Sequence, residues 1–246
     1  MNILSIDTAT ELLSLALDSG GNGVWSCEAD AGRRHSELIM DCITSLMQKA
    51  QMKPEELSGV VCMGGPGSFT GLRIGFSLAK GLSLSLGIPF APIPTLDCMA
   101  RPFSSRPGIV VPVIDARQGA FFCALYRGGK KLCADMDAKP SAIAAALEEA
   151  VTEAGEKPNE QALLIGPGAE MLYEQLTAVR LDTPMQVNLV QRKDLRCGNA
   201  LSLLEIARET DVFAAGGKAA NGAYLDSGPE YIRKSDAEIQ WLANSG

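Results

Sequence analysis

The sequence predicts an α/β protein built from two similar halves, and three observations support this prediction. The first is an internal repeat: the segment 3–21 matches the segment 111–129 when Asp7 is aligned with Asp115, an offset of 108 residues (115 − 7). The second is the order of the predicted elements, which is the same in both halves. The third is the length, because 246 residues suit two small domains that share a cleft.

Each copy of the repeat begins as a β-hairpin that leads into a third strand. An apolar run is followed by a turn that begins with aspartate, a second apolar run and a Gly-Gly turn. An amphipathic helix, a short strand that ends in Gly-Pro-Gly, and another helix come next. In the first half we expect these elements over 36–51, 60–63 and 70–86, and in the second half over 141–154, 162–165 and 169–177. Ser36 and Ser141 are the expected N-caps of the two first helices.

This element order is that of the duplicated actin and Hsp70-like ATPase fold, which is ribonuclease H-like. We therefore expect two small domains, each with a mixed sheet and helices. The first domain is expected over 1–102, joined by a late helix over 194–210, and the second over 103–193. The Pro- and Ser-containing stretch 101–108 suits the linker between them. A C-terminal tail over 211–246 carries the segment PEYIR.

Composition and charge favour a soluble protein that does not bind nucleic acid unaided. Hydrophobic residues make up 46% of the chain and charged residues 21%, which is ordinary for a globular protein. The sequence has no apolar run of membrane-spanning length and no basic segment ahead of its first apolar residues, so we expect a cytoplasmic protein without a membrane association. The net charge of −7 disfavours direct binding to tRNA, because affinity for phosphate backbones comes from clustered Lys and Arg.

Cysteine and histidine usage argues against a metal site. The seven cysteines are widely spaced and contain no CxxC pair, so we expect buried, reduced thiols. His35 is the only histidine, and zinc or iron sites of the usual kinds need more. A peptidase is not indicated either, because the sequence has no GxSxG elbow and no recognisable pair of nucleophile and base.

The two aspartate-led turns are candidate vestigial phosphate loops. In the duplicated ATPase fold these turns face each other across the cleft and hold nucleotide phosphates and magnesium. The candidates here are Asp7, Thr8, Thr10 and Asp115. Asp and Thr are also common turn formers, and their position alone does not make a catalyst. A small-molecule kinase or ATPase that uses Asp7 and Asp115 as magnesium ligands is the alternative function, with 216–217 as its only candidate for an adenosine pocket.

The segment GGPGSFTGLRIG, residues 64–75, is rich in glycine but matches no phosphate motif. No glycine in it precedes Lys-Ser or Lys-Thr, and the third glycine of the dinucleotide fingerprint is missing. Small residues instead recur at every fourth position, at Gly67, Gly71, Gly75 and Ala79. Such a stripe runs along one face of a helix and lets another backbone approach closely. Close packing must offset the cost of about 1 kcal/mol for each helical glycine.

The helix that carries this stripe is apolar on nearly all sides, with a polar strip of only Arg73, Ser77 and Lys80. Such a helix is buried on nearly all sides. We expect the adjacent helix 36–51 and a second protein chain to cover it; the alternative is a helix wholly internal to the core. The expected partner contacts are Ile39, Ile43, Met47, Gly71, Leu72, Gly75, Leu78, Ala79 and Leu82, with Arg73 at the rim. Gly71→Leu or Gly75→Leu is then expected to abolish partner binding without affecting the stability of the isolated chain.

The sequence resembles the TsaB (YeaZ) family. Its members are bacterial subunits of the machinery that makes threonylcarbamoyladenosine beside the tRNA anticodon. The matching pieces are IDTAT at 6–10, HSE at 35–37, GPGSFTGLRIG at 65–75, TL at 95–96, IDARQGAFFCALY at 114–126 and PEYIR at 229–233. They span nearly the whole chain. Two departures are visible: HSELIMD lacks the Pro that often follows, and ARQGAFF replaces the commoner acidic residue before the aromatic.

The resemblance implies a non-catalytic scaffold subunit that is required for threonylcarbamoyl transfer to adenosine. In that family TsaD performs the transfer with a metal held by paired histidines, and this chain has no such pair. The resemblance also implies a heterodimer with TsaD through the helices 36–51 and 70–86, a complex with the ATPase TsaE, and a homodimer when TsaD is absent. We expect no metal and no tightly bound cofactor in the chain alone, and only indirect contact with tRNA; ATP or ADP at the partner interface stays open.

Overall fold

The computed structural model describes residues 1–153, 160–177, 185–190, 198–213 and 224–232. The first sheet is formed by β1 (Asn2–Asp7), β2 (Leu12–Ser19), β3 (Val24–Asp30), β4 (Gly59–Gly65) and β5 (Phe90–Pro94). The second is formed by β6 (Ile109–Asp115), β7 (Phe121–Cys123), β8 (Tyr126–Arg127), β9 (Lys130–Lys131), β10 (Met136–Ala138), β11 (Glu160–Ile165) and β12 (Met185–Leu189).

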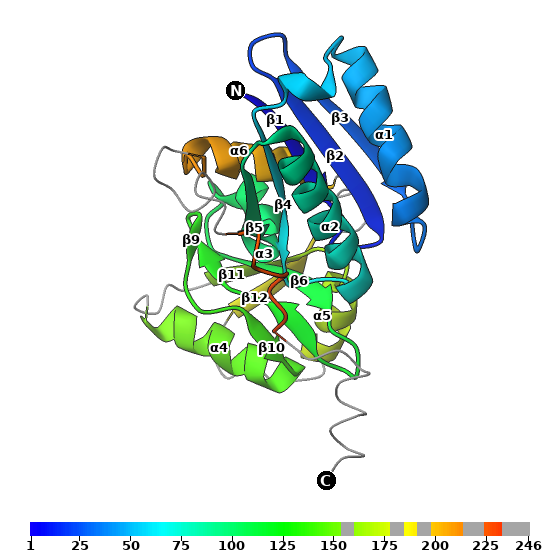
Figure 1. Ribbon diagram of the computed structural model, residues 1–246. Helices are drawn as coiled ribbons and strands as arrows, with labels where there is room; N and C mark the ends of the chain where they lie inside the picture. Colours follow the sequence, from blue (N-terminus) through cyan, green and yellow to red (C-terminus); the bar gives the residue numbers. More distant parts are fainter. Residues whose placement is uncertain (154–159, 178–184, 191–197, 214–223, 233–246) are drawn as a thin grey trace.

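The two sheets repeat one topology. Their strand orders are β3-β2-β1-β4-β5 and β10-β7-β6-β11-β12, and β8 and β9 extend the second sheet beside β6. In each sheet the hairpin is antiparallel and the later strands are parallel to the first strand. Both sheets are therefore mixed, and helices pack against them (Figure 1). The predicted α/β class and the duplicated actin-like fold are confirmed.

The helices lie close to their predicted positions. They are α1 (His35–Lys49), α2 (Phe69–Leu86), α3 (Thr95–Ala100), α4 (Pro140–Glu153), α5 (Ala169–Thr177) and α6 (Ala200–Glu209), with short 3₁₀ turns η1 (Pro54–Glu56) and η2 (Arg101–Phe103). The expected caps of the two first helices are wrong, because Ser36 and Ser141 both lie inside the first turn. Arg34 precedes α1 without a side-chain cap, and Pro140 begins α4, where its fixed φ suits the first helical position.

The repeat differs between the copies at the second strand of the hairpin. In the first half β2 pairs with β1 along its whole length, from Asn2 opposite Ser19 to Asp7 opposite Ser14. In the second half the equivalent strand is divided into β7 and β8, which pair with the two ends of β6. The fifth strands, β5 and β12, were not predicted from the sequence. Two prolines obscured β5, which tolerates them because it lies at the edge of its sheet.

The two faces of the first sheet carry different helices. Alternate residues of β1 point to opposite faces, so Leu4 and Ile6 join a core with α1 and α2, while Ile3 joins a core with α6. Figure 1 shows α1 and α2 together on one side of this sheet and α6 on the other. A further apolar cluster joins α3 to the second sheet, with Leu96 and Met99 packed near Val110 and Leu163. The late helix α6 thus packs on the first sheet, although it follows the second half in the chain.

Candidate functional site

The glycine stripe of α2 packs against the turn that follows β1 in the same chain. A Cβ atom at Gly71 would overlap the carbonyl oxygen of Thr8, and one at Gly75 would lie 2.5 Å from the Thr8 hydroxyl. A Cβ at Gly67 would lie 2.6 Å from the carbonyl oxygen of Ala9. The Thr8 hydroxyl also donates a hydrogen bond of 2.7 Å to the carbonyl oxygen of Gly71. The backbone that approaches the stripe is therefore internal, and the prediction that these glycines touch a second protein chain is wrong.

Several other residues predicted to contact a partner are also buried within their own chain. Leu72 and Ala79 face the core of the first half, and Ile39 fills the space between α1 and the sheet. We correct the predicted interface accordingly: Gly71, Leu72, Gly75, Ala79 and Ile39 are enclosed by their own chain. Among the remaining predicted residues, Ile43 and Met47 are buried but line the groove described below, Leu78 and Leu82 are half-buried, and Arg73 is exposed.

The polar strip of α2 binds the C-terminal segment 224–232. The Lys80 ammonium donates a hydrogen bond of 2.7 Å to the carbonyl oxygen of Leu225 and another to that of Ser227. The Arg73 guanidinium lies 3.8 Å from the centre of the Phe69 ring and donates a hydrogen bond of 3.2 Å to the Tyr231 hydroxyl. A segment far along the chain therefore covers one side of α2. This side was expected to be covered by a second protein chain.

The same segment explains two further glycines. The Glu230 amide donates a hydrogen bond of 2.7 Å to the carbonyl oxygen of Gly64. Gly65 has a φ of 112°, and a Cβ there would overlap the carbonyl oxygen of Glu230. Glycine is required because both the backbone angle and the approach of segment 224–232 exclude a side chain. The glycines of the stretch 64–75 thus pack against other segments of the same chain.

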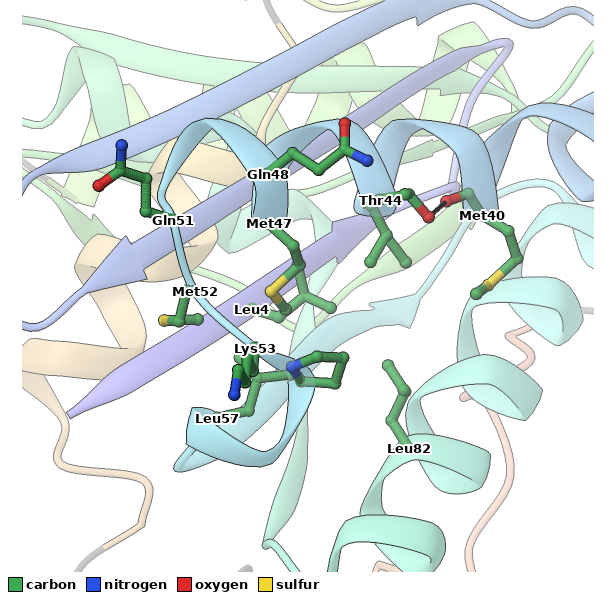
Figure 2. A pocket seen from close by; sticks show the side chains of 12 residues that line it. Leu4, Met40, Thr44, Met47, Gln48, Gln51, Met52, Lys53, Leu57 and Leu82 are labelled. Atoms are coloured by element: carbon green, nitrogen blue, oxygen red, sulfur yellow. Dashed lines mark hydrogen bonds between the residues drawn. The ribbon is translucent and has the colours of Figure 1, made fainter.

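An apolar groove of about 380 Å³ lies between α1 and α2 and is the candidate functional site. Figure 2 shows α1 along one side of it, with Leu82 of α2 opposite. Leu4 of β1 and Leu57 lie beneath, and Lys53 is the only ionisable side chain in the lining. The complete lining is Leu4, Met40, Ile43, Thr44, Met47, Gln48, Gln51, Met52, Lys53, Pro54, Leu57 and Leu82.

The groove brings together three of the predicted partner contacts: Ile43, Met47 and Leu82. Met40 was missed, although its side chain is 50% exposed at the edge of the groove. The signal in the sequence was that Met40 is an apolar residue within the predicted helix 36–51, directly after Ile39. Leu84, on the last turn of α2, is 69% exposed. Flexible methionine side chains and exposed leucines are typical of surfaces that bind another apolar surface.

The candidate phosphate loops have structural roles within the chain. Asp7 is buried; its Oδ1 accepts a hydrogen bond of 3.0 Å from the Ala9 amide. Its Oδ2 accepts from the amide and the side chain of Asn199, at 3.0 and 3.1 Å. In the second half, Asp115 Oδ1 accepts a hydrogen bond of 2.7 Å from the amide of Arg117. Both aspartates thus bond the amide two residues later, which is the ordinary use of Asp in a turn.

The two threonines of the first turn are also engaged in local bonds. Thr8 holds α2, as described above, and the Thr10 hydroxyl accepts a hydrogen bond of 3.3 Å from the Leu12 amide. In the part of the chain that the structure describes, no three His, Cys, Asp or Glu side chains are grouped so that they could hold a metal ion. The pair 216–217, the faint candidate for an adenosine pocket, lies outside the described residues.

A second hollow, of about 550 Å³, lies between the two halves of the molecule. Thr10 lines it together with residues of the second half such as Ile165 and Gly166. Glu11, Glu28 and Asp30 also line it. Three carboxylates are unfavourable neighbours for a phosphate group unless cations offset their charge. The groove between α1 and α2 is therefore the better candidate site.

Burial perturbs the two ionisable groups behind the first turn. His35 is 4% exposed, and its Nε2 atom has no hydrogen-bond partner among the described residues. Burial lowers the pKa of His35, and the nearby negative charge of Asp7 offsets only part of this effect. Burial also raises the pKa of Asp7, against the effect of its hydrogen bonds from Ala9 and Asn199. The imidazole therefore has a local role at the start of α1, where it is held in its neutral form.

The fold and the groove together define a class: a duplicated actin-like protein with an exposed helical face on its first half. The TsaD family model, tRNA N6-adenosine threonylcarbamoyltransferase, matches residues 28–241. A Bacillus subtilis (strain 168) protein, "tRNA threonylcarbamoyladenosine biosynthesis protein TsaB", is 28% identical over 98% of both chains. The protein of the same name from Escherichia coli (strain K12) is 35% identical over 52% of this chain and 55% of its own.

A solved structure from Pseudomonas aeruginosa, of an uncharacterised protein with similarity to peptidase YeaZ, has the same fold. It superposes with a TM-score of 0.71 at 20% identity, over 94% of this chain and 99% of its own. The chain belongs to the family of the TsaD model, and within that family to the TsaB/YeaZ group. Among the described residues, no helix combines the length and the apolar character needed to cross a membrane.

We expect Gly71→Ala to destabilise the chain, because its Cβ would meet the backbone of Thr8, which cannot rotate away. Overpacking of this kind costs about 1–3 kcal/mol in the free energy of unfolding. Gly81→Ala on the same helix is the matched control: nothing lies within 4 Å of a Cβ there. It should stabilise the chain by up to about 1 kcal/mol through helix propensity. Urea denaturation measures both, and equal effects of the two substitutions would contradict the internal role of Gly71.

The buried imidazole predicts a pH dependence of stability. Because the folded protein lowers the pKa of His35 below its ordinary value of 6.5, the unfolded chain binds the proton more readily. The contribution of His35 to the free energy of unfolding is present above pH 6.5 and is lost as the pH falls through the lowered pKa. His35→Gln removes the titrating group, so its stability should fall less between pH 7 and pH 5. Urea denaturation at several pH values tests this, and parallel pH profiles would argue against a buried neutral His35.

Proposed function

We propose that this chain is a non-catalytic partner subunit required for threonylcarbamoyl transfer to the adenosine beside the tRNA anticodon. It binds TsaD through the face that α1 and α2 present, and TsaD supplies the catalytic groups. The observation that carries the proposal is the largely apolar groove between these helices, with Lys53 as its only ionisable lining residue and the half-exposed Met40 at its edge. Membership of a family whose proteins are named for threonylcarbamoyladenosine biosynthesis supplies the reaction.

The use of the aspartate-led turns supports a role without catalysis. All the hydrogen bonds of the Asp7 carboxylate described above hold the chain's own backbone and Asn199. Thr8 is committed to α2. A kinase or ATPase would need these groups to face phosphate and magnesium. The alternative function is therefore not favoured.

The remaining partners follow from the same face and from the charge of the chain. We propose that a second copy occupies the groove when TsaD is absent, and that TsaE joins the complex of this chain with TsaD. We propose that ATP or ADP, where it is required, binds at the interface with the partner. The net charge of −7 suits a subunit that meets tRNA only indirectly, through more basic partners in the cytoplasm.

Met40→Asp tests the proposed interface. The side chain is half exposed, so the isolated chain should keep its stability, while a carboxylate at an apolar interface should weaken binding to TsaD at least about tenfold. Met171→Asp on α5 is the matched control, because Met171 is 45% exposed on a helix of the second half. Isothermal titration with TsaD from the same organism gives both affinities. Unchanged binding of the Met40 variant, or equal loss in both variants, would refute the proposed docking face.

A further inference from the structure

The connection between the two sheets is a packed helix. The chain leaves β5, forms α3 and η2, and then enters β6. Cys98 of α3 is fully buried in a core with Ile3 of the first sheet and Leu203 of α6. Leu96 and Met99 are buried in the core on the second sheet. The side chains of one short helix are therefore shared between the cores of both sheets.

Cys98 suits this position because it packs as a small apolar side chain. Burial raises the pKa of its thiol well above the usual value, so the thiol stays protonated. The sequence predicted buried thiols, and this is confirmed for Cys62, Cys98 and Cys123. The prediction is wrong for three half-buried cysteines, which are Cys27, Cys42 and Cys133. Cys197 lies outside the described residues.

The second sheet leaves room for Met99. A Cβ atom at Gly166 would overlap the terminal methyl group of Met99 and would lie 2.7 Å from the carbonyl oxygen of Val113. Gly166 follows β11 and opens the second Gly-Pro-Gly. A helix that is held this closely has little freedom to slide across the second sheet.

Asp97 of α3 ties the connection to the second sheet. It accepts a hydrogen bond from the Tyr126 hydroxyl of β8 and another, of 3.0 Å, from the Lys131 ammonium of β9. Both bonds reach the same carboxylate oxygen. Lys131 is held in turn by an ion pair of 2.6 Å with Asp135. Burial raises the pKa of Tyr126, and its hydrogen bond to Asp97 raises it further, so the phenol stays protonated and is the donor.

Arg101 ties the connection to the first sheet. It begins η2, and its guanidinium forms ion pairs with Glu205, at 3.6 Å, and with Glu209. Both glutamates belong to α6, which packs on the first sheet. Partly exposed ion pairs contribute little singly, and their effect here adds to that of the buried contacts. The connection thus has a polar and an apolar tie to each sheet.

We infer that α3 and η2 lock the two sheets together as one rigid body, which opens and unfolds as a unit. Domains with a sparsely packed connection move relative to one another, whereas a connection buried on both sides prevents a hinge motion. Met99, Pro102 and Phe103 of this connection also line the hollow of about 550 Å³ between the halves. The hollow therefore keeps its width, and rotation of one sheet toward the other does not enclose a ligand there.

Native-state hydrogen exchange of the full chain in increasing urea tests the lock. Read by mass spectrometry, it gives the opening free energy of each sheet separately. We expect the most protected amides of β1 and β4 to show the same opening free energy, and the same dependence on urea, as those of β6 and β11. A chain in which one sheet opens at a lower urea concentration than the other would overturn the inference.

Arg208→Ala distinguishes a lock from two separate sheets of equal stability. Arg208 forms an ion pair with Asp18, which joins α6 to β2 and involves no residue of the connection. In a locked molecule this variant should speed the exchange of both sheets by the same factor. Acceleration of the first sheet alone would show that the sheets open separately, and would overturn the inference.

Asp97→Ala combined with Met99→Ala loosens the hold of the connection on the second sheet. In this variant we expect the two sheets to open separately, with exchange of their core amides that differs at least tenfold between the sheets at one urea concentration. Exchange that is accelerated equally in both sheets, as in Arg208→Ala, would overturn the role of these two residues in the lock.

Discussion

The contact between α2 and the turn after β1 is the constraint on which the rest of the first half depends. Gly71 and Gly75 bring the helix so close to Thr8 that no side chain fits between them, and the Thr8 hydroxyl bonds to the helix backbone. A helix this close to the sheet has little freedom to slide or rotate. The direction of Arg73 and Lys80 toward segment 224–232 follows from this position, as does the place of Leu82 at the groove.

The same turn gives its buried aspartate a structural role. Burying the Asp7 carboxylate is costly, and hydrogen bonds to Ala9 and to Asn199 offset the cost. Asn199 directly precedes α6, so the carboxylate joins a helix from the end of the chain to the first strand. The Ser5 hydroxyl adds a hydrogen bond of 2.8 Å to the carbonyl oxygen of Ala200. The carboxylate of Asp7 and the hydroxyl of Ser5 thus hold the start of the chain's own late helix against the first strand.

The sequence was sufficient for the fold but not for the neighbours of its helices. Hydrophobic periodicity and the repeated Gly-Pro-Gly located five of the six α-helices among the described residues, because both signals are local. The short β5 was missed because Pro92 and Pro94 mask its pattern, and only the contact with β4 makes it a strand. The stripe of Gly71 and Gly75 predicted close approach of a backbone, which is correct. A periodicity of small residues does not show whether the approaching backbone belongs to the same chain or to a partner. Here the backbone is that of Thr8 in the same chain.

The candidate site was only partly visible for a related reason. Ile43, Met47 and Leu82 were selected as apolar residues on two neighbouring helices, and they do line one groove. The residues that complete it, Met52 and Leu57, belong to the irregular segment after α1, where no periodic pattern exists. Sequence patterns thus located the two helices of the site, whereas tertiary packing brings the other lining residues to it.

Different parts of α2 serve its two roles. Its first two turns carry Gly71 and Gly75 and are required for contact with Thr8. Its last turns carry Leu82 and Leu84, which the fold leaves half-buried or exposed. The surface proposed for partner binding lies on these last turns and on α1, where substitution can alter docking without disturbing the packing of Gly71 and Gly75 that holds the helix in place.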